Sequence, residues 1–194
     1  KLGIVDHDTV GLSNIHRQSL YDEKDINQPK VKIAKKKLSK INSKTKINIF
    51  NLKLNKTTFE KIIKNYDYIV DGTDNFESKF LINDLSLKYK KFLVTGAISK
   101  FDGHIFTFNF TNKKDPCLRC FYQEETISDE ILNCEYEGIL GTVAGIIGTL
   151  QANEVLKKIL NIGQNLNGYI LILDLLNLNF RKAKINKRKK CLCN

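Results

Sequence analysis

A short segment near the middle of the chain constrains the fold more than any other. Residues 66–75 combine a strand, a glycine break and a helix start. The apolar run 68–70 predicts a buried strand of a parallel sheet, apolar on both faces, and Asn75 can cap the helix that follows. Because ligands of open α/β sheets lie beyond the carboxyl ends of the strands, we expect an α/β fold in which Asp74 lies close to a ligand or its Mg²⁺. The alternative is that Asp74 only helps to cap the helix.

The chain is basic, with 194 residues and a formal net charge of +11. Such a balance can indicate binding to nucleic acid or to an anionic membrane. The lysines are mostly spread along the chain among many asparagines, and the two basic clusters, 30–40 and 181–190, lack the interleaved aromatic residues that stack on bases. We therefore expect neither nucleic acid nor a membrane as a partner.

Nothing in the sequence predicts export or membrane insertion. No signal peptide is visible, and the longest apolar stretch, 139–150, is shorter than the ~20 residues that span a bilayer. We expect a cytoplasmic protein whose 194 residues form one domain. The chain contains no Met and opens on the apolar run 2–5, so we also expect that an N-terminal segment precedes it.

Three residues in the first thirty positions have the chemistry of a nucleotide site. Asp6 follows a short strand, where an acidic residue typically holds ribose hydroxyls, although a Gly-rich loop normally precedes it. Arg17 could clamp phosphate oxygens or could simply lie on the surface. Lys30 follows Pro29 in the first turn of a predicted helix, where a cation is unfavourable against the helix dipole and a phosphate would be stabilised. A solvated lysine is the alternative for Lys30.

Hydrophobic periodicity predicts the remaining elements. Strict alternation over 103–110 is typical of a half-exposed, antiparallel strand, whereas 138–160 has the pattern of a long helix. Small residues recur along that helix, which favours a position in the core or at a subunit interface. Further strands are predicted at 46–52, 92–95, 168–174 and 178–185, and a further helix at 76–89.

The five cysteines are more readily explained by metal binding or by catalysis than by disulfide bonds, because disulfides are rare in the cytosol. Cys117 and Cys120 form a C-x₂-C pair after a turn, and Cys191 and Cys193 form a tighter C-x-C pair. Two thiolate pairs brought together would make a closed tetrahedral site for structural zinc. A redox pair and unrelated buried thiols are the alternatives. The remaining Cys134 could attack an acyl group or join a sulfur-transfer chain, or it could be an inert buried thiol.

Five short motifs follow one another along the chain at fitting distances. They are Asp6-x-Asp8-x-Val10-x₂-Ser13-Asn14-x₂-Arg17-Gln18, Gln28-Pro29-Lys30, Thr73-Asp74-Asn75, Pro116-Cys117-x-Arg119-Cys120 and Gly145-x₂-Gly148-x-Leu150-Gln151-Ala152-x-Glu154. Together they resemble the ThiF/MoeB/HesA family, the bacterial relatives of ubiquitin-activating enzymes. The resemblance covers essentially the whole chain, and it is nearest to the adenylyltransferases that act on the molybdopterin-synthase or thiazole sulfur carriers.

The resemblance implies a Rossmann-like fold with a mostly parallel central sheet, helices on both faces, added antiparallel strands and a Cys₄ zinc knuckle. Residues 1–194 would form a single, N-terminally incomplete adenylation domain, with a zinc module made by 115–121 and 186–194. Members of the family are typically homodimers that bind ATP, Mg²⁺ and the C-terminal Gly-Gly tail of a small ubiquitin-like sulfur-carrier protein. The tail carboxylate attacks the α-phosphate and gives an acyl-adenylate and pyrophosphate, a step in sulfur transfer for molybdopterin or thiamine biosynthesis.

The matching motif positions also imply residue roles around the nucleotide. Asp6 would hold the ribose. Lys30 would neutralise the negative charge that builds on the phosphates, and Asp74 would bind Mg²⁺. Both roles suit a reaction at a phosphate, because such a reaction needs mainly positioning and charge neutralisation. The phosphates would also be contacted by Ser13, Asn14 and Arg17, and Asn75 would lie beside Asp74. Of these residues, Arg17, Lys30 and Asp74 would be catalytic.

Two departures from the family pattern bear on the function. The Gly-rich nucleotide loop and an N-terminal Arg are absent, and the last cysteine pair is C-x-C where the family usually has C-x₂-C. The alternative is therefore a truncated or degenerate member that acts as a non-catalytic zinc-binding, dimerising module. A nicotinamide-dependent dehydrogenase would explain Asp6 but not the phosphate set or the cysteines. Cys134 falls where some members carry a cysteine that joins the carrier protein, which makes it a further candidate catalytic residue.

Overall fold

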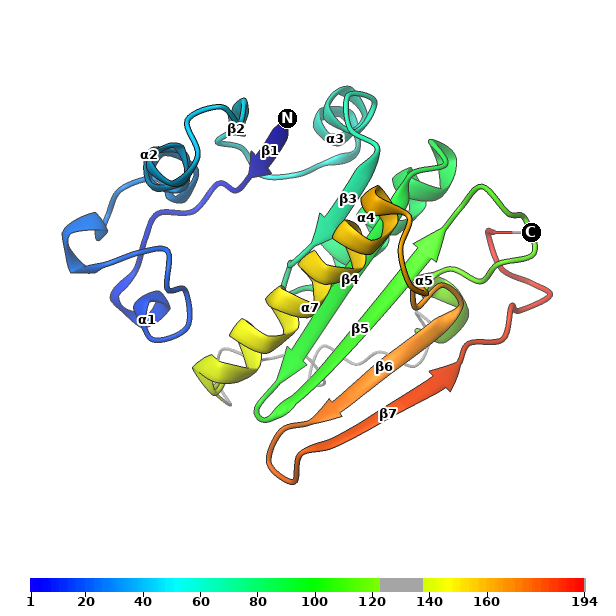
Figure 1. The fold of residues 1–194 in the computed structure, drawn as a ribbon. Coiled ribbons are helices and arrows are strands. Elements are labelled where there is room, and N and C mark those ends of the chain that lie inside the picture. The colour runs from blue at the N-terminus through cyan, green and yellow to red at the C-terminus, as the bar shows by residue number, and fades with distance from the viewer. Residues whose placement is uncertain (123–137, 194) are drawn as a thin grey trace. The chain divides into compact units, whose positions relative to one another are not determined.

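The computed structural model describes residues 1–122 and 138–193 and divides into two compact units (Figure 1). The first unit is Lys1–Asn55 and the second is Lys56–Asn194. Each unit has its own sheet and its own buried apolar residues. Residues 123–137 and residue 194 lie outside the described part of the chain.

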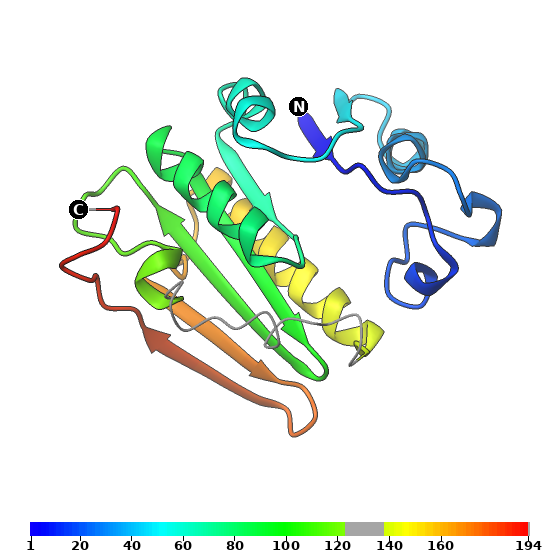
Figure 2. The same ribbon diagram turned by 180° about the vertical axis from the view of Figure 1, so that it is seen from behind.

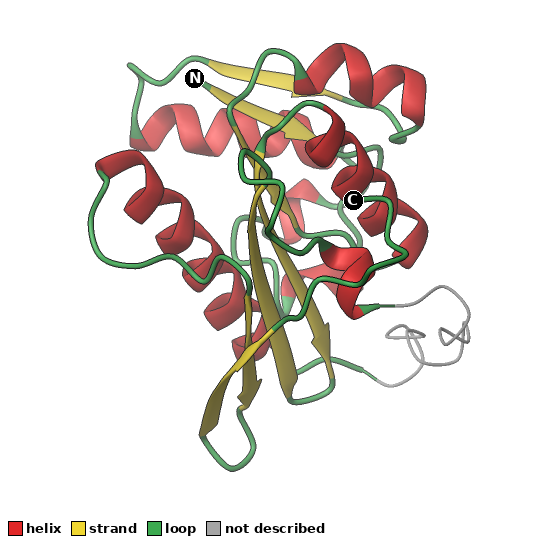
Figure 3. Ribbon diagram, turned by 90° about the vertical axis from the view of Figure 1, so that its right-hand side faces the viewer, coloured by secondary structure: helices red, strands yellow, loops and turns green. Residues whose placement is uncertain are grey.

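The first unit is built around two parallel strands joined through a helix (Figures 1 and 3). Its elements are β1 (Leu2–Val5), α1 (Leu12–Ile15), the 3₁₀ turn η1 (Glu23–Asp25), α2 (Lys30–Ile41) and β2 (Ile47–Phe50). The register places Leu2 opposite Ile47. α2 lies against β2 and buries Val31, Ile33 and Ala34. The helix predicted after Pro29 is thus confirmed, and it begins at Lys30.

The second unit is a five-stranded sheet with helices on both faces. Its strands are β3 (Tyr68–Asp71), β4 (Phe92–Ser99), β5 (Asp102–Asn109), β6 (Tyr169–Asp174) and β7 (Asn179–Lys184), in that spatial order. Its helices are α3 (Lys56–Ile63), α4 (Phe76–Lys88), α5 (Leu118–Phe121) and α7 (Gly141–Leu160). α7 covers one face of the sheet in Figure 1, and α4 covers the other face in Figure 2.

Most of this sheet is antiparallel, which corrects the expectation of a mostly parallel sheet. Within it only β3 and β4 pair in parallel, and the other three pairings are antiparallel. Short connections explain two of these antiparallel pairings, because residues 100–101 join β4 to β5 and residues 175–178 join β6 to β7. A parallel crossover would need a dozen or more residues. The predicted antiparallel strand over 103–110 is confirmed as β5.

Two predictions about burial are wrong. β3 was expected to be buried on both faces, yet Tyr68 and Val70 are 36% and 53% exposed. β3 is the edge strand of the five-stranded sheet of the second unit. β5 was expected to be half-exposed, yet Ile105 and Phe106 are buried. This central strand is covered by α7 on one face and by the ring of Phe121 on the other.

The main core of the second unit lies between α7 and strands β4 and β5. α7 buries Val143, Ile147, Gln151 and Glu154, a spacing of three and four that belongs to one helical face. Two of these side chains are polar, so each needs a hydrogen-bond partner within the core. No helix in the described part of the chain is long and apolar enough to cross a membrane.

Candidate functional site

Lys30 is held at the first turn of α2 by a carboxylate. Only 7% of Lys30 is exposed, and its Nζ donates to Oδ2 of Asp8 at 3.0 Å. Tyr21 donates its hydroxyl hydrogen to the carbonyl oxygen of Lys30 at 3.3 Å. The alternative of a solvated Lys30 is therefore wrong. Sequence reasoning quoted Asp8 within a motif but missed it as the partner of Lys30.

Asp6 lies directly after β1 and shapes the turn that carries this pair. Its Oδ1 accepts a hydrogen bond from the backbone N–H of Asp8 at 2.9 Å. His7 lies between the two carboxylates, with Nε2 at 3.4 Å from Oδ1 of Asp8. Burial, together with the negative charges of Asp6 and Asp25, raises the pKa of Tyr21 to about 12. Asp6 therefore contributes negative charge to the same region as Lys30.

Ser13, Asn14 and Arg17 lie on and just after the short helix α1. Asn14 accepts a hydrogen bond at Oδ1 from the N–H of Gly11 at 3.0 Å, which stabilises the start of the turn. Arg17 donates from Nη1 to the carbonyl oxygen of Ser13 at 2.7 Å. This bond folds the guanidinium back over α1. The side chains of Ser13 and Arg17 therefore belong to one turn of the chain.

In the second unit, Asp74 lies between β3 and the start of α4. Asn75 caps the helix, because its Oδ1 accepts from the N–H of Ser78 at 2.8 Å. Asp74 is exposed, and its Oδ1 accepts from Nδ2 of Asn75 at 3.2 Å. Asn75 is thus the cap that was predicted, and the alternative role of Asp74 as a helix cap is not needed.

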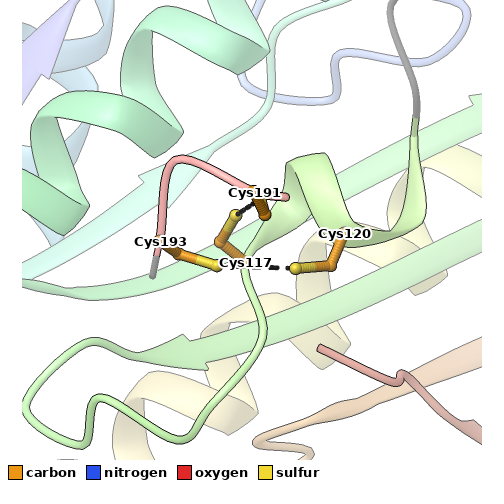
Figure 4. A group of neighbouring side chains, drawn as sticks. All are labelled: Cys117, Cys120, Cys191 and Cys193. Carbon is orange, nitrogen blue, oxygen red and sulfur yellow. Dashed lines mark hydrogen bonds between the residues drawn. The ribbon is translucent and has the colours of Figure 1, made fainter. Parts of the chain in front are cut away.

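Four cysteines from two distant segments meet in the second unit (Figure 4). The Sγ atoms of Cys117 and Cys191 are 3.5 Å apart, and so are those of Cys120 and Cys193. All four sulfur atoms lie within 4.8 Å of one another, a group that could hold a metal ion. The tight C-x-C spacing at the end of the chain therefore does not keep the second pair from joining the first.

The thiols of this cluster influence one another. Burial and the neighbouring thiols raise the pKa of Cys117, and burial with hydrogen bonds from the other thiols raises that of Cys193 to about 12. Burial acts in the same direction on Cys120, but hydrogen bonds from the backbone of Cys117 and Arg188 hold its pKa below the ordinary value. The four neighbouring thiols therefore do not all readily lose their protons, and a bound cation would favour their thiolate forms.

The cysteine cluster is fastened to α4 by a second set of polar contacts. Arg119 lies between Cys117 and Cys120 and makes two bonds of 2.8 Å to Asp84, from Nε to Oδ1 and from Nη2 to Oδ2. Its guanidinium lies over the ring of Phe80. This two-pronged, stacked arrangement is one that a lysine could not reproduce, and it fixes α5 on the helix that begins beside Asp74.

The structure thus brings some of the predicted residues together and leaves other predictions open. Lys30 and Asp6 meet around Asp8 in the first unit, and the four cysteines meet in the second. Arg17 and Lys30 belong to the first unit and Asp74 to the second, so their convergence around one nucleotide stays a prediction. Cys134 lies outside the described residues.

Comparisons with known proteins agree on one family. A model described as the ThiF family matches residues 1–194. The sulfur carrier protein adenylyltransferase of Thermus thermophilus is 34% identical over 194 residues, which cover 98% of this chain and 72% of that protein. A probable molybdopterin-synthase adenylyltransferase of Porphyra purpurea is 42% identical over 186 residues, 95% of this chain and 48% of that protein.

A solved structure shows the same fold. The crystal structure of Escherichia coli MccB with ATP matches with a TM-score of 0.84 and 18% identity, over 99% of this chain and 58% of that one. At that identity the match establishes the α/β fold. Apart from the Thermus protein, the chain spans about half the length of the curated relatives that it matches, from 42% to 51%.

Proposed function

The chain belongs to the ThiF family, whose model covers residues 1–194, and from this we propose that it is the adenylating part of a sulfur-carrier adenylyltransferase. The reaction would join the C-terminal carboxylate of a small carrier protein to the α-phosphate of ATP and release pyrophosphate. The observation that carries the proposal is the family match over the whole length, together with curated relatives named for this activity at 34% and 42% identity.

The partner would be a ubiquitin-like sulfur-carrier protein that ends in Gly-Gly. One curated relative is named a sulfur carrier protein adenylyltransferase and another a probable molybdopterin-synthase adenylyltransferase, which supports a carrier protein as the partner. A tail of two glycines has no side chains, so it can lie close to a backbone and bring its carboxylate up to a phosphate. The sulfur that the activated carrier then receives would serve molybdopterin or thiamine synthesis.

Lys30 is the side chain best suited to neutralise the triphosphate. It stands in the first turn of α2, where the helix dipole already favours an anion, and Asp8 holds its ammonium group in place. Asp8 itself is 51% exposed, so its bond to Lys30 can be exchanged for a phosphate oxygen. Arg17, Ser13 and Asn14 would contact further phosphate oxygens, and Asp6 would hold the ribose hydroxyls.

Asp74 would hold the Mg²⁺ that accompanies ATP, with Asn75 beside it. The residue fits this ion because its carboxylate is exposed and is not used as a helix cap. Mg²⁺ bound with a nucleotide usually takes one or two carboxylates and the phosphates themselves. When bound, the ion shields the phosphate charges from the incoming carboxylate.

The four-cysteine cluster would hold a structural zinc ion. With Zn–S bonds of about 2.3 Å, a regular tetrahedron has S–S edges of about 3.8 Å. The two Sγ pairs at 3.5 Å are near that figure, and all four Sγ atoms lie within 4.8 Å of one another, so the set can close around one ion. The cluster leaves no open position for a substrate, so we assign zinc a structural role in a module formed by residues 115–121 and 186–194.

The protein would act as a homodimer, with residues 1–194 as one adenylation domain. Leu156, Ile159 and Leu160 are more than half exposed near the end of α7. Neighbouring exposed apolar residues of this kind support a contact with a second copy.

Pyrophosphate exchange tests the reaction. We expect the full-length protein that contains this chain to exchange radioactive pyrophosphate into ATP only when a carrier with its Gly-Gly end is present. The matched control is the same carrier shortened by those two glycines, which should support no exchange. Absence of exchange with every carrier that has this tail would favour the non-catalytic zinc-binding module instead.

A lysine substitution tests the assigned phosphate contact. We expect Lys30→Met to lower kcat/KM for exchange by about 100-fold or more, the usual effect of removing one group that stabilises charge in the transition state. Lys36→Met is the control, because Lys36 is an exposed lysine on the same helix. Equal activities of the two variants would contradict the role of Lys30.

A further inference from the structure

A buried ion pair lies directly beneath the loop that carries Asp74. Lys79, in the first turns of α4, places its Nζ 3.2 Å from Oδ2 of Asp71, the last residue of β3. The side chains of Lys79 and Asp71 are 3% and 0% exposed. Lys79 also donates to the carbonyl oxygen of Gly96 at 2.5 Å, and the hydroxyl of Thr95 donates to the same Oδ2 of Asp71. Neither charge has a part in the proposed reaction.

Stability alone does not explain this pair. Removing two charges from water costs a large part of what their attraction returns, and apolar residues of the same volume often serve stability equally well. The residues of the pair nevertheless have further partners, because Nε2 of Gln151 on α7 also donates to the backbone carbonyl oxygen of Asp71 at 2.8 Å. Contacts from β4, α4 and α7 therefore fix one residue, Asp71, in one place.

Asp71 also holds the loop that follows β3 in place, through its second carboxylate oxygen. Its Oδ2 faces the core and receives Lys79 and Thr95, while its Oδ1 faces the loop and accepts two bonds from Thr73. The Thr73 N–H donates at 2.8 Å and its hydroxyl at 2.7 Å. On the far side of Asp74, the N–H of Lys79 donates to the carbonyl oxygen of Asn75 at 3.2 Å. The loop is thus held at one end by the side chain of Asp71 and at the other end by the first turn of α4, whose Lys79 side chain in turn binds Asp71.

We infer that Asp71 and Lys79 are positioning residues, which clamp residues 72–75 so that the exposed carboxylate of Asp74 keeps one place for a divalent cation. The inference rests on the proposed function, since it gives Asp74 a cation to hold. Thr73 transmits the clamp, because its two bonds are the direct link between the buried carboxylate and the loop.

Direct cation binding by the full protein tests the inference. Substituting Asp71 or Lys79 would leave an unpaired buried charge and could prevent folding, so Thr73 is the residue to change. Mn²⁺ is the probe, and its free concentration in the presence of ATP is read by electron paramagnetic resonance. We expect Thr73→Val to weaken Mn²⁺ binding about fivefold, the effect of losing one ordinary hydrogen bond, and Thr73→Ser, which keeps the hydroxyl, to restore it.

A matched control separates positioning from a general loss of structure. The hydroxyl of Thr111 donates to Oδ1 of Asn109 at 3.0 Å, so it also bonds a side chain two residues earlier, but in a loop far along the chain from Asp74. Thr111→Val should leave Mn²⁺ affinity unchanged, and the thermal midpoints of the two valine variants should be similar. If Thr73→Val bound Mn²⁺ as tightly as Thr111→Val, the positioning role would be overturned.

A further variant distinguishes this inference from the proposed function. Asp74→Asn should lose most of the Mn²⁺ affinity. If it did, and Thr73→Val had no effect, the clamp alone would be overturned and Asp74 would keep its assignment. If Asp74→Asn bound Mn²⁺ as tightly as the unaltered protein, the assignment of Asp74 as a cation ligand would be overturned. The positioning role of Asp71 and Lys79 would be overturned with it.

Discussion

Glu154 shows how one buried side chain can organise several segments. It lies on the buried face of α7, only 3% exposed. Its Oε2 accepts from the hydroxyl of Thr107 at 3.0 Å, from Nδ2 of Asn165 at 3.1 Å and from the N–H of Leu166 at 2.8 Å, while Lys157 pairs with its other oxygen. α7, β5 and the connection to β6 are therefore joined at a single carboxylate.

The charge of Glu154 should make stability depend on pH. Burial acts to raise its pKa, but the bonds from Lys157, Leu166 and Asn165 outweigh burial and hold the pKa below its ordinary value. The stabilisation is therefore complete above the unfolded pKa of about 4.3 and is lost as the pH falls through the lower folded value. We expect Glu154→Gln to lower the free energy of unfolding at pH 7 by about 2–3 kcal/mol, and by less at pH 3.5.

Urea unfolding at the two pH values measures this effect. Glu60→Gln is the control, because Glu60 has a lysine partner but lies on the surface, where an ion pair contributes little. A Glu154→Gln difference that stayed the same at both pH values would contradict a role for the carboxylate charge.

At the scale of elements, the contact of α7 with β4 depends on a glycine. A Cβ atom placed on Gly96 would lie 2.8 Å from Cδ of Gln151 and 2.9 Å from Cγ2 of Ile147. Both neighbours are on the buried face of α7 and pack against the sheet. A side chain at Gly96 would therefore collide with the buried face of α7.

We expect Gly96→Ala to lower the free energy of unfolding by about 1–3 kcal/mol, the usual cost of overpacking a core. Gly148→Ala is the matched control on α7, because a Cβ there meets nothing within 4 Å among the described residues, and an alanine inside a helix is favoured over glycine by about 0.5–1 kcal/mol. Chemical denaturation of both variants provides the measurement, and a stabilised Gly96→Ala would show that α7 can move away.

The positions of these elements could be predicted from the sequence, but their burial could not. The Asn75 cap, the helix after Pro29 and the alternating strand over 103–110 each depend on residues close together in the chain, and all three are confirmed. Whether a strand lies at the edge or in the middle of a sheet depends on partners far away. β5 is buried because α7, some thirty residues later, covers one of its faces and Phe121 packs on the other, and no pattern within the strand predicts this.

At the scale of the molecule, the cysteine cluster ties together distant parts of the chain. Cys117 and Cys191 are 74 residues apart. A cross-link that closes a loop of this length removes conformational entropy from the unfolded chain worth about 4 kcal/mol. Metal binding at the cluster would therefore contribute to the stability of the whole second unit.

We expect removal of the metal with a strong chelator to lower the thermal midpoint of unfolding by several degrees, about 2–4 °C for each kcal/mol lost. Calorimetry before and after chelation, with the zinc content determined in parallel, provides the measurement. Cys191→Ser should lower the midpoint without chelator, whereas Cys134→Ser keeps all four cluster cysteines and should not. A chelator that leaves the midpoint unchanged would contradict a structural metal.

The candidate sites were predictable to different degrees for a chemical reason. Two pairs of cysteines have few roles other than a shared metal site or disulfides, so they already predict one cluster. Aspartate and lysine are usually solvated, so Asp71 and Lys79, eight positions apart, gave no sign of a buried pair. The pair is seen only in the structure, where Nζ of Lys79 lies 3.2 Å from Oδ2 of Asp71. The convergence of Arg17, Lys30 and Asp74 stays a prediction.

The separation of the two cysteine pairs also matters while the protein is being made. At 5–20 residues per second, a ribosome needs roughly 4–14 s to travel from Cys120 to Cys191. During that interval the first two thiols have emerged without their partners, and Cys134 is the next thiol to follow them. The first pair must therefore survive oxidation and wrong pairing until the second arrives.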